Sequence, residues 1–192
     1  MSRLSCVSSN SQATSATTKF FSTAPRYSQS LSRGAFLRRR FVRKQMPSPP
    51  QLVALARKAA GAQSLDPALV CAVIEQESSW NNWAMRYEPA FFAKYVAHLF
   101  TNNKITASEA YARGFSWGLM QVMGQVAREM GFEGTFLSAL CDPEHGLAIG
   151  CKLLRKKLDA MDGDTTRGLL AWNGGGNPAY PTQVLARRAH YL

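Results

Sequence analysis

Residues 66–81 have the sequence DPALVCAVIEQESSWN, which carries the strongest structural signal in the chain. Asp66 followed by Pro67 is typical of a helix start, because the aspartate side chain caps free backbone N–H groups and proline suits the first turn. Leu69 and Val73 recur at helical spacing and indicate a buried face. The stretch therefore predicts a buried helix that ends shortly after its second glutamate.

Glu77 shares the buried face of this helix, since it lies four residues after Val73 and seven after Val70. Apolar neighbours and the negative C-terminal end of the helix dipole both favour the protonated carboxyl group. Such a group can act as a general acid near neutral pH. The alternative is a half-exposed carboxylate at a fraying helix end. Glu75 points away from this face and is expected in solvent.

The rest of the body also predicts helices. No stretch alternates between apolar and polar residues as a half-buried strand would, so the expected fold class is all-α, with one domain over 49–192. Thr106 and Glu109 form a capping box, and Asp142 with Pro143 repeats the start signal of the first stretch. The further helices are expected over about 51–62, 106–114, 118–130, 143–158, 165–172 and 181–191.

Residues 1–48 differ in composition from the body. They hold nine of the 23 Lys and Arg residues and none of the 12 Asp and Glu residues, so the net charge of +11 divides into +9 and +2. A Ser- and Arg-rich segment without hydrophobic periodicity is expected to be disordered. Its open roles are a passive or artefactual leader, an organelle-targeting peptide, or contact with nucleic acid or an anionic membrane. A body of only +2 argues against a nucleic-acid-binding domain.

Neither a secretory signal nor a membrane span is indicated, because residues 1–48 lack the continuous apolar run of roughly 7–15 residues that a signal needs, and no stretch approaches the ~20 apolar residues of a span. The domain is therefore expected to be soluble. Its four cysteines form no CxxC pair. Cys141, His145 and Cys151 come nearest to a zinc site but lack a fourth ligand, so buried thiols are the favoured interpretation. No metal and no cofactor are expected.

Three short sequences occur in order along the body: IEQESSWN (74–81), SWGLMQVM (116–123) and AWNGGGNPAY (171–180). Together they resemble the soluble lytic transglycosylase (SLT) domain of the lysozyme superfamily, whose fold is shared with goose-type lysozyme. The resemblance extends over about residues 50–192. It implies a lysozyme-like fold and cleavage of the bond between N-acetylmuramic acid and N-acetylglucosamine in peptidoglycan.

The resemblance implies roles for individual residues. Glu77 takes the position of the catalytic acid/base, and Ser78 follows it and helps to hold the helix end. Gly118 allows close backbone approach, while Met120 and Gln121 line the sugar groove. The residues expected to bind substrate are Ser78, Arg86, Glu88, Ser116, Gly118, Met120, Gln121, Trp172, Asn173 and Tyr180.

Departures from the family pattern affect these expectations. Glu77 and Gly118 lie 41 positions apart, a longer separation than in the short form of the family, and the extra segment is expected to bring Arg86 and Glu88 beside the cleft. Trp172 replaces a tyrosine whose hydroxyl can reach the catalytic glutamate, and an indole is expected not to make that hydrogen bond. Tyr180 falls where a later aromatic flanks the saccharide.

The mechanism that the resemblance implies uses one carboxyl group. Glu77 would protonate the glycosidic oxygen and then accept the proton of the C6 hydroxyl, which closes a 1,6-anhydro ring. Two alternatives stay open: a hydrolytic lysozyme with Glu88 as second carboxylate, and a non-catalytic wall-binding or virion structural module.

The expected partner is the peptidoglycan glycan strand. A monomer acting at the cell wall is expected, and the missing secretory signal favours a phage protein, carried in the virion or released through a membrane pore.

Overall fold

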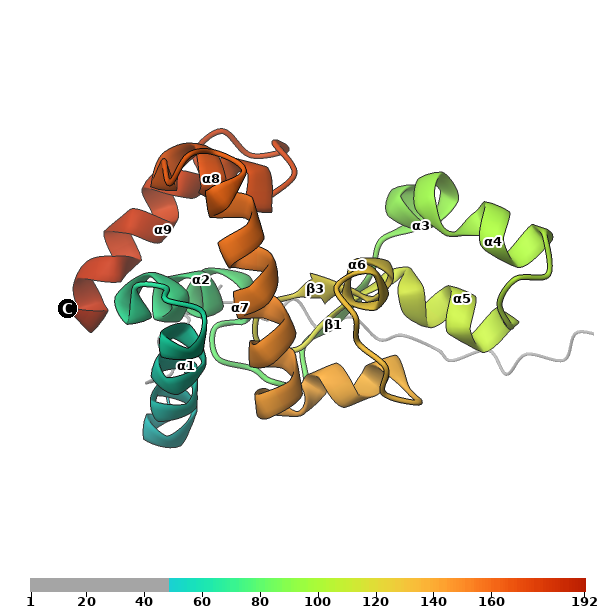
Figure 1. The fold of residues 1–192 in the computed structure, drawn as a ribbon, viewed down its shortest axis with the longest axis horizontal. Coiled ribbons are helices and arrows are strands. Elements are labelled where there is room, and N and C mark those ends of the chain that lie inside the picture. The colour runs from blue at the N-terminus through green and yellow to red at the C-terminus, as the bar shows by residue number, and fades with distance from the viewer. Residues whose placement is uncertain (1–48) are drawn as a thin grey trace, which may run out of the picture. The chain divides into compact units, whose positions relative to one another are not determined.

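The computed structural model describes residues 49–192. The prediction of a disordered leader over 1–48 lies outside the described residues. Within them the chain is mainly helical, which confirms the predicted fold class (Figure 1). None of the described helices is long and apolar enough to cross a membrane.

Helix α2 (Pro67–Ser78) lies at the centre of the core, and its residues from Ala68 to Glu75 are all buried. Several helices cover it. Helices α1 and α9 and the 3₁₀ helix η2 pack on α2, while α7 packs on both α1 and α8. The bounds of these elements are α1 (Pro50–Ala62), α7 (Pro143–Asp159), α8 (Thr165–Trp172), α9 (Tyr180–Arg188) and η2 (Ala189–Tyr191). Because α2 is covered on several sides, even the polar Glu75 is buried, while Gln76, Glu77 and Ser78 at the end of the helix stay partly exposed.

The helix starts follow the caps that the sequence predicts. The Asp66 side chain accepts the Ala68 N–H at 2.9 Å at the start of α2. Asp142 caps α7 in the same way, and Thr106 caps α5 (Ala107–Arg113). Each cap satisfies a backbone N–H that has no partner inside the helix, which fixes where the helix begins.

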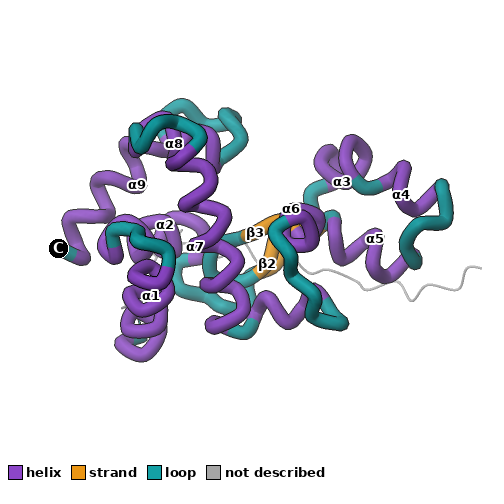
Figure 2. Tube along the Cα trace, viewed as in Figure 1, coloured by secondary structure: helices purple, strands orange, loops and turns teal. Residues whose placement is uncertain are grey.

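The structure also contains a three-stranded antiparallel sheet in the order β1-β2-β3. Its strands are drawn in orange in Figure 2. Its strands are β1 (Met85–Tyr87), β2 (Phe115–Trp117) and β3 (Val122–Met123). The predicted helix over 118–130 is therefore wrong for 118–123, and only α6 (Gly124–Glu129) is helical. Gly118 at φ +68° and Gln121 at φ +48° take left-handed conformations, which form a tight turn and interrupt any helix.

The segment between β1 and β2 forms three short helices, α3 (Pro89–Tyr95), α4 (Ala97–Thr101) and α5, which lie together in Figure 1. Neither α3 nor α4 contains a buried residue. Aromatic rings hold the segment together instead: Phe92 stacks on Tyr111 with ring centroids 5.5 Å apart. The 3₁₀ helix η1 (Leu137–Cys141) then leads into α7.

Candidate active site

Glu77 lies in the last turn of α2, and its carboxyl group meets side chains from two other helices. Its Oε1 accepts a hydrogen bond from the Tyr180 hydroxyl at 2.5 Å and another from Trp172 Nε1 at 2.9 Å. Trp172 ends α8 and Tyr180 begins α9. Three helices from distant parts of the sequence therefore converge on one carboxyl oxygen.

Burial raises the pKa of Glu77 above its ordinary value of 4.5. The hydrogen bonds from Tyr180 and Trp172 and the positive charge of Arg86 lower it, but they do not cancel the effect of burial. Because desolvation disfavours the charged form, the protonated carboxyl group persists to higher pH than that of an exposed glutamate. The site thus holds a group suited to donate a proton and then take one back.

Tyr180 has a different place from the one predicted. Its side chain is only 3% exposed, so it lies under the site and contacts the carboxyl group; it does not flank a sugar at the surface. Burial and the neighbouring Glu77 carboxylate raise the pKa of Tyr180 far above its ordinary value of 10.0. The hydroxyl therefore stays protonated and remains a hydrogen-bond donor.

Trp172 corrects a second expectation. The indole ring nitrogen makes the hydrogen bond to Glu77 that was expected to be absent. The only donor of an indole is this N–H, and the position of Trp172 at the end of α8 directs it at Oε1. A tryptophan thus supplies the contact without a hydroxyl group.

Residues 116–123 (SWGLMQVM) support the end of α2 through hydrogen bonds. Ser78 Oγ donates to the carbonyl of Leu119 at 2.8 Å, which links the residue after Glu77 to the β2–β3 turn. Within this turn, Gln121 Oε1 accepts from Ser116 Oγ at 2.8 Å, and its Nε2 donates to the carbonyls of Ala84 and Gly118. The Ser116 hydroxyl and both ends of the Gln121 amide are thus hydrogen-bonded within the turn and its neighbours. Ser116 and Gln121 therefore support the site.

Two further predicted residues have structural surroundings. Met120 is 1% exposed and packs against Gly150 on α7, so it fills the core and does not line a groove. Asn173 Oδ1 accepts the Asn177 N–H at 2.8 Å and closes the glycine-rich turn between α8 and α9. This turn sets the path from Trp172 to Tyr180, so Asn173 affects the site through the backbone.

Arg86 and Glu88 form an ion pair at 2.5 Å on the edge of β1. The Arg86 side chain is 76% exposed and that of Glu88 is 31% exposed. Arg86 is close enough to Glu77 for its charge to lower the pKa of that carboxyl group. The expected place of Arg86 and Glu88 beside a cleft stays a prediction, and the Glu88 carboxylate is paired with the arginine.

Glu75 was missed by the sequence reasoning. It was expected in solvent, but it is 8% exposed and accepts a hydrogen bond from the Tyr191 hydroxyl at 2.7 Å. The signal that could have found it is the unbroken apolar run before it, because residues 68–74 are apolar on every side of the helix. Such a helix is buried all round, so a glutamate at its end has no solvent face.

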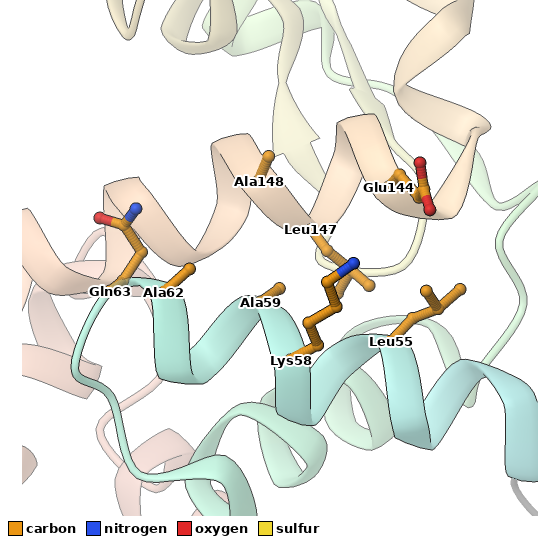
Figure 3. A pocket seen from close by; sticks show the side chains of 8 residues that line it. All are labelled: Leu55, Lys58, Ala59, Ala62, Gln63, Glu144, Leu147 and Ala148. Carbon is orange, nitrogen blue, oxygen red and sulfur yellow. The ribbon is translucent and has the colours of Figure 1, made fainter.

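No metal site is formed within residues 49–192, where no three His, Cys, Asp or Glu side chains gather closely enough to hold an ion. Burial raises the pKa of Cys71 to about 11 and that of Cys151 to about 12, so both thiols stay protonated. A cavity of about 260 Å³ lies between α1 and α7, where Leu55 and Lys58 face Glu144 and Leu147 (Figure 3). Its lining includes none of the side chains around Glu77.

Comparison with known protein families matches residues 54–183 to the transglycosylase SLT domain. The matched region includes Glu77, Trp172 and Tyr180, so all three helices that converge on the carboxyl group lie within it. No solved structure matches the chain significantly.

Proposed function

The chain belongs to the transglycosylase SLT domain family, and from this premise we propose that it cleaves the β-1,4 bond between N-acetylmuramic acid and N-acetylglucosamine, with 1,6-anhydro product formation. Family membership makes it a transglycosylase- or glycosidase-type enzyme whose substrate is peptidoglycan, a polymer outside the cytoplasm. In the proposal, Glu77 is the single general acid and base.

The observation that carries the proposal is the unequal use of the two Glu77 oxygens. Oε1 accepts both hydrogen bonds, from Tyr180 and from Trp172. Among residues 49–192, no side chain or backbone group hydrogen-bonds Oε2. Two donors on Oε1 fix the carboxyl plane and place negative charge there, so Oε2 is the oxygen that carries and exchanges the proton.

The reaction then proceeds in two balanced steps. Oε2–H of Glu77 protonates the glycosidic oxygen, which leaves as the O4 hydroxyl of N-acetylglucosamine as its bond to C1 of N-acetylmuramic acid breaks. The N-acetyl group of the muramic acid stabilises the positive charge that develops at C1. Glu77, now a carboxylate, removes the proton of the C6 hydroxyl as O6 bonds to C1, so the acid is regenerated and no water is consumed.

The hydrolytic alternative requires a second carboxylate at the site, and Glu88 is the candidate. Its Oε1 is paired with Arg86, and the charge that acts on Glu77 comes from the arginine. This arrangement supports a single-carboxyl mechanism. The non-catalytic alternative is disfavoured by the raised pKa of Glu77, since burying a carboxyl group is costly and binding alone does not need one.

The test is the mass of the fragments that the protein releases from peptidoglycan in heavy-oxygen water. We expect fragments with a 1,6-anhydro end, lighter by one water than the hydrolysis product and without the isotope. Fragments with a reducing muramic acid that carries heavy oxygen would exclude the transglycosylase and leave the lysozyme. Absence of any release by the folded protein would favour the wall-binding module.

Substitution of Arg86 and substitution of Glu88 should shift the pKa of Glu77 in opposite directions. Arg86→Ala removes a positive charge that lowers the pKa of Glu77, so the alkaline limb of the kcat/KM profile shifts to higher pH. Glu88→Gln leaves Arg86 without its partner charge, so the limb shifts to lower pH. Both variants lower turnover several-fold, and because the pair is exposed, unfolding free energies change by about 0.5 kcal/mol or less. The measurement is activity against pH, with urea unfolding beside it.

The matched control is Arg155→Ala on α7, because Arg155 forms a comparable ion pair with Asp159. This change should leave the pH profile in place. If Arg86→Ala and Glu88→Gln both behave like the control, the pair is structural and does not act on the reaction.

The cellular setting is part of the proposal. We propose a monomer that reaches glycan strands from a virion or through a membrane pore made by a phage. Contact of the basic segment 1–48 with nucleic acid or an anionic membrane belongs to the same proposal.

A further inference from the structure

A second buried carboxylate lies on the same helix as Glu77 and is not used by the proposed reaction. Glu75 is 8% exposed, and the groups that face it include three from α9 and η2. The Tyr191 hydroxyl donates to its Oε2 at 2.7 Å, His190 Nδ1 lies 3.5 Å from the same oxygen, and Arg187 Nε lies 3.9 Å from Oε1. This carboxylate anchors the C-terminal part of the described chain.

Tyr191 is the centre of this anchor. Its hydroxyl donates to Glu75 and accepts from Trp80 Nε1 at 2.9 Å, so its donor and one acceptor site are both used. The rings of Trp80 and Tyr191 pack with centroids 5.9 Å apart. Arg57 on α1 donates to the Tyr191 carbonyl at 2.7 Å. Loss of this hydroxyl would remove one donor from Glu75 and leave the Trp80 N–H without its acceptor.

The Tyr191 anchor and the Tyr180 contact with Glu77 lie at opposite ends of the segment formed by α9 and η2. Tyr180 is the first residue of α9, and Tyr191 follows three residues after α9 ends. Between them, Gln183 accepts from Gln76 Nε2 at 3.2 Å and Arg188 pairs with Asp66. Because α9 is a short continuous helix, a shift at its C-terminal end moves Tyr180 at the other end.

We infer that Tyr191 is a positioning residue for the proposed reaction: by fastening α9 to Glu75, it holds the Tyr180 hydroxyl on Glu77 Oε1. This inference rests on the proposed role of Glu77. It assigns the Glu75–Tyr191–Trp80 network a function beyond stability. A displacement of about 1 Å in a catalytic contact can lower the reaction rate by about 10²-fold.

The test compares Tyr191→Phe with Tyr111→Phe, a control in which an exposed tyrosine on α5 loses its hydroxyl. The readout is the pKa of the Glu77 carboxyl group, followed by carbon NMR and assigned with Glu77→Gln. Burial is the largest influence on the pKa of Glu77 and raises it, while Tyr180, Trp172 and Arg86 lower it. Since the Tyr180 hydrogen bond lowers the pKa of Glu77, its loosening in Tyr191→Phe should raise that pKa. The control should not change it.

A double variant tests the route of the effect. If Tyr191 acts through Tyr180, then adding Tyr191→Phe to Tyr180→Phe raises the Glu77 pKa no further. We also expect kcat of Tyr191→Phe to fall about tenfold with KM nearly unchanged. An unchanged or lowered Glu77 pKa in Tyr191→Phe, or full additivity in the double variant, would overturn the inference.

A second variant, Arg188→Gln, tests the inference even if Tyr191→Phe fails to fold. Arg188→Gln releases α9 from Asp66 at a half-exposed position and leaves the core filled. It should raise the Glu77 pKa in the same direction by a smaller amount, and no change there would also count against the inference. The NMR readout does not require activity, so failure of the proposed function, seen in the released fragments, is distinguishable from failure of the positioning role.

Discussion

Glu77→Gln lowers the rate of glycan cleavage by about 10²–10⁴-fold, with the upper end expected because one group serves as acid in the first step and as base in the second. Glutamine keeps an oxygen at the position of Oε1, so Tyr180 and Trp172 still have their acceptor. What disappears is the titrating proton on the other oxygen. The measurement is release of soluble fragments from purified peptidoglycan, with circular dichroism to establish the fold. Near-normal activity in this variant would contradict both the transglycosylase and the lysozyme.

The same variant has a signature in stability against pH. The folded pKa of Glu77 is raised, so its contribution to stability is complete below the ordinary pKa of 4.5 and is lost as the pH rises through the folded value. Glutamine cannot ionise and escapes that loss. Glu77→Gln should therefore melt at the same temperature as the wild type in acid and at an equal or higher temperature at neutral pH. Thermal melts at both pH values check this, and a neutral-pH destabilisation would contradict it.

Local sequence signals predicted the helices well where one residue could fix a boundary. Asp66, Thr106 and Asp142 cap helices at the expected places, because a cap is a contact between residues two or three apart. The helix prediction for residues 118–123 was wrong because the turn there depends on contacts with residues far away in the sequence. The apolar spacing there suits a helix, but the turn is set by Gly118 and Gln121 in left-handed conformations, whose partners include the distant carbonyl of Ala84.

The candidate site could be predicted only in part. Glu77 was found because its position on an apolar face is a local property. The roles of Tyr180 and Trp172 as donors to that carboxyl group depend on the packing of α8 and α9 against α2, which no spacing in the sequence specifies. Glu75 was misplaced for the same reason, since its partner Tyr191 lies 116 residues away.

Gly118→Ala is expected to be the most destabilising of the changes considered. A Cβ at this position would lie 2.3 Å from the carbonyl oxygen of Leu140, a backbone atom that cannot rotate away. Gly118 also has φ +68°, which disfavours any residue with a side chain. Together the clash and the strain should lower the free energy of unfolding by about 3–5 kcal/mol, which is more than most single substitutions cost. Urea unfolding of the purified variant measures it.

Gly163→Ala separates the two causes, because Gly163 has φ +80° but nothing within 4 Å of an added Cβ. It should lose only about 1–2 kcal/mol, the cost of the left-handed conformation alone. The difference between the variants then reports the contact with Leu140. Any folded Gly118→Ala protein should also cleave glycan more slowly, since the displaced turn carries the Leu119 carbonyl that Ser78 holds beside Glu77. Equal stability of the two variants would mean that the turn can move without strain, and Ser78 would then have no fixed support from which to hold the end of α2.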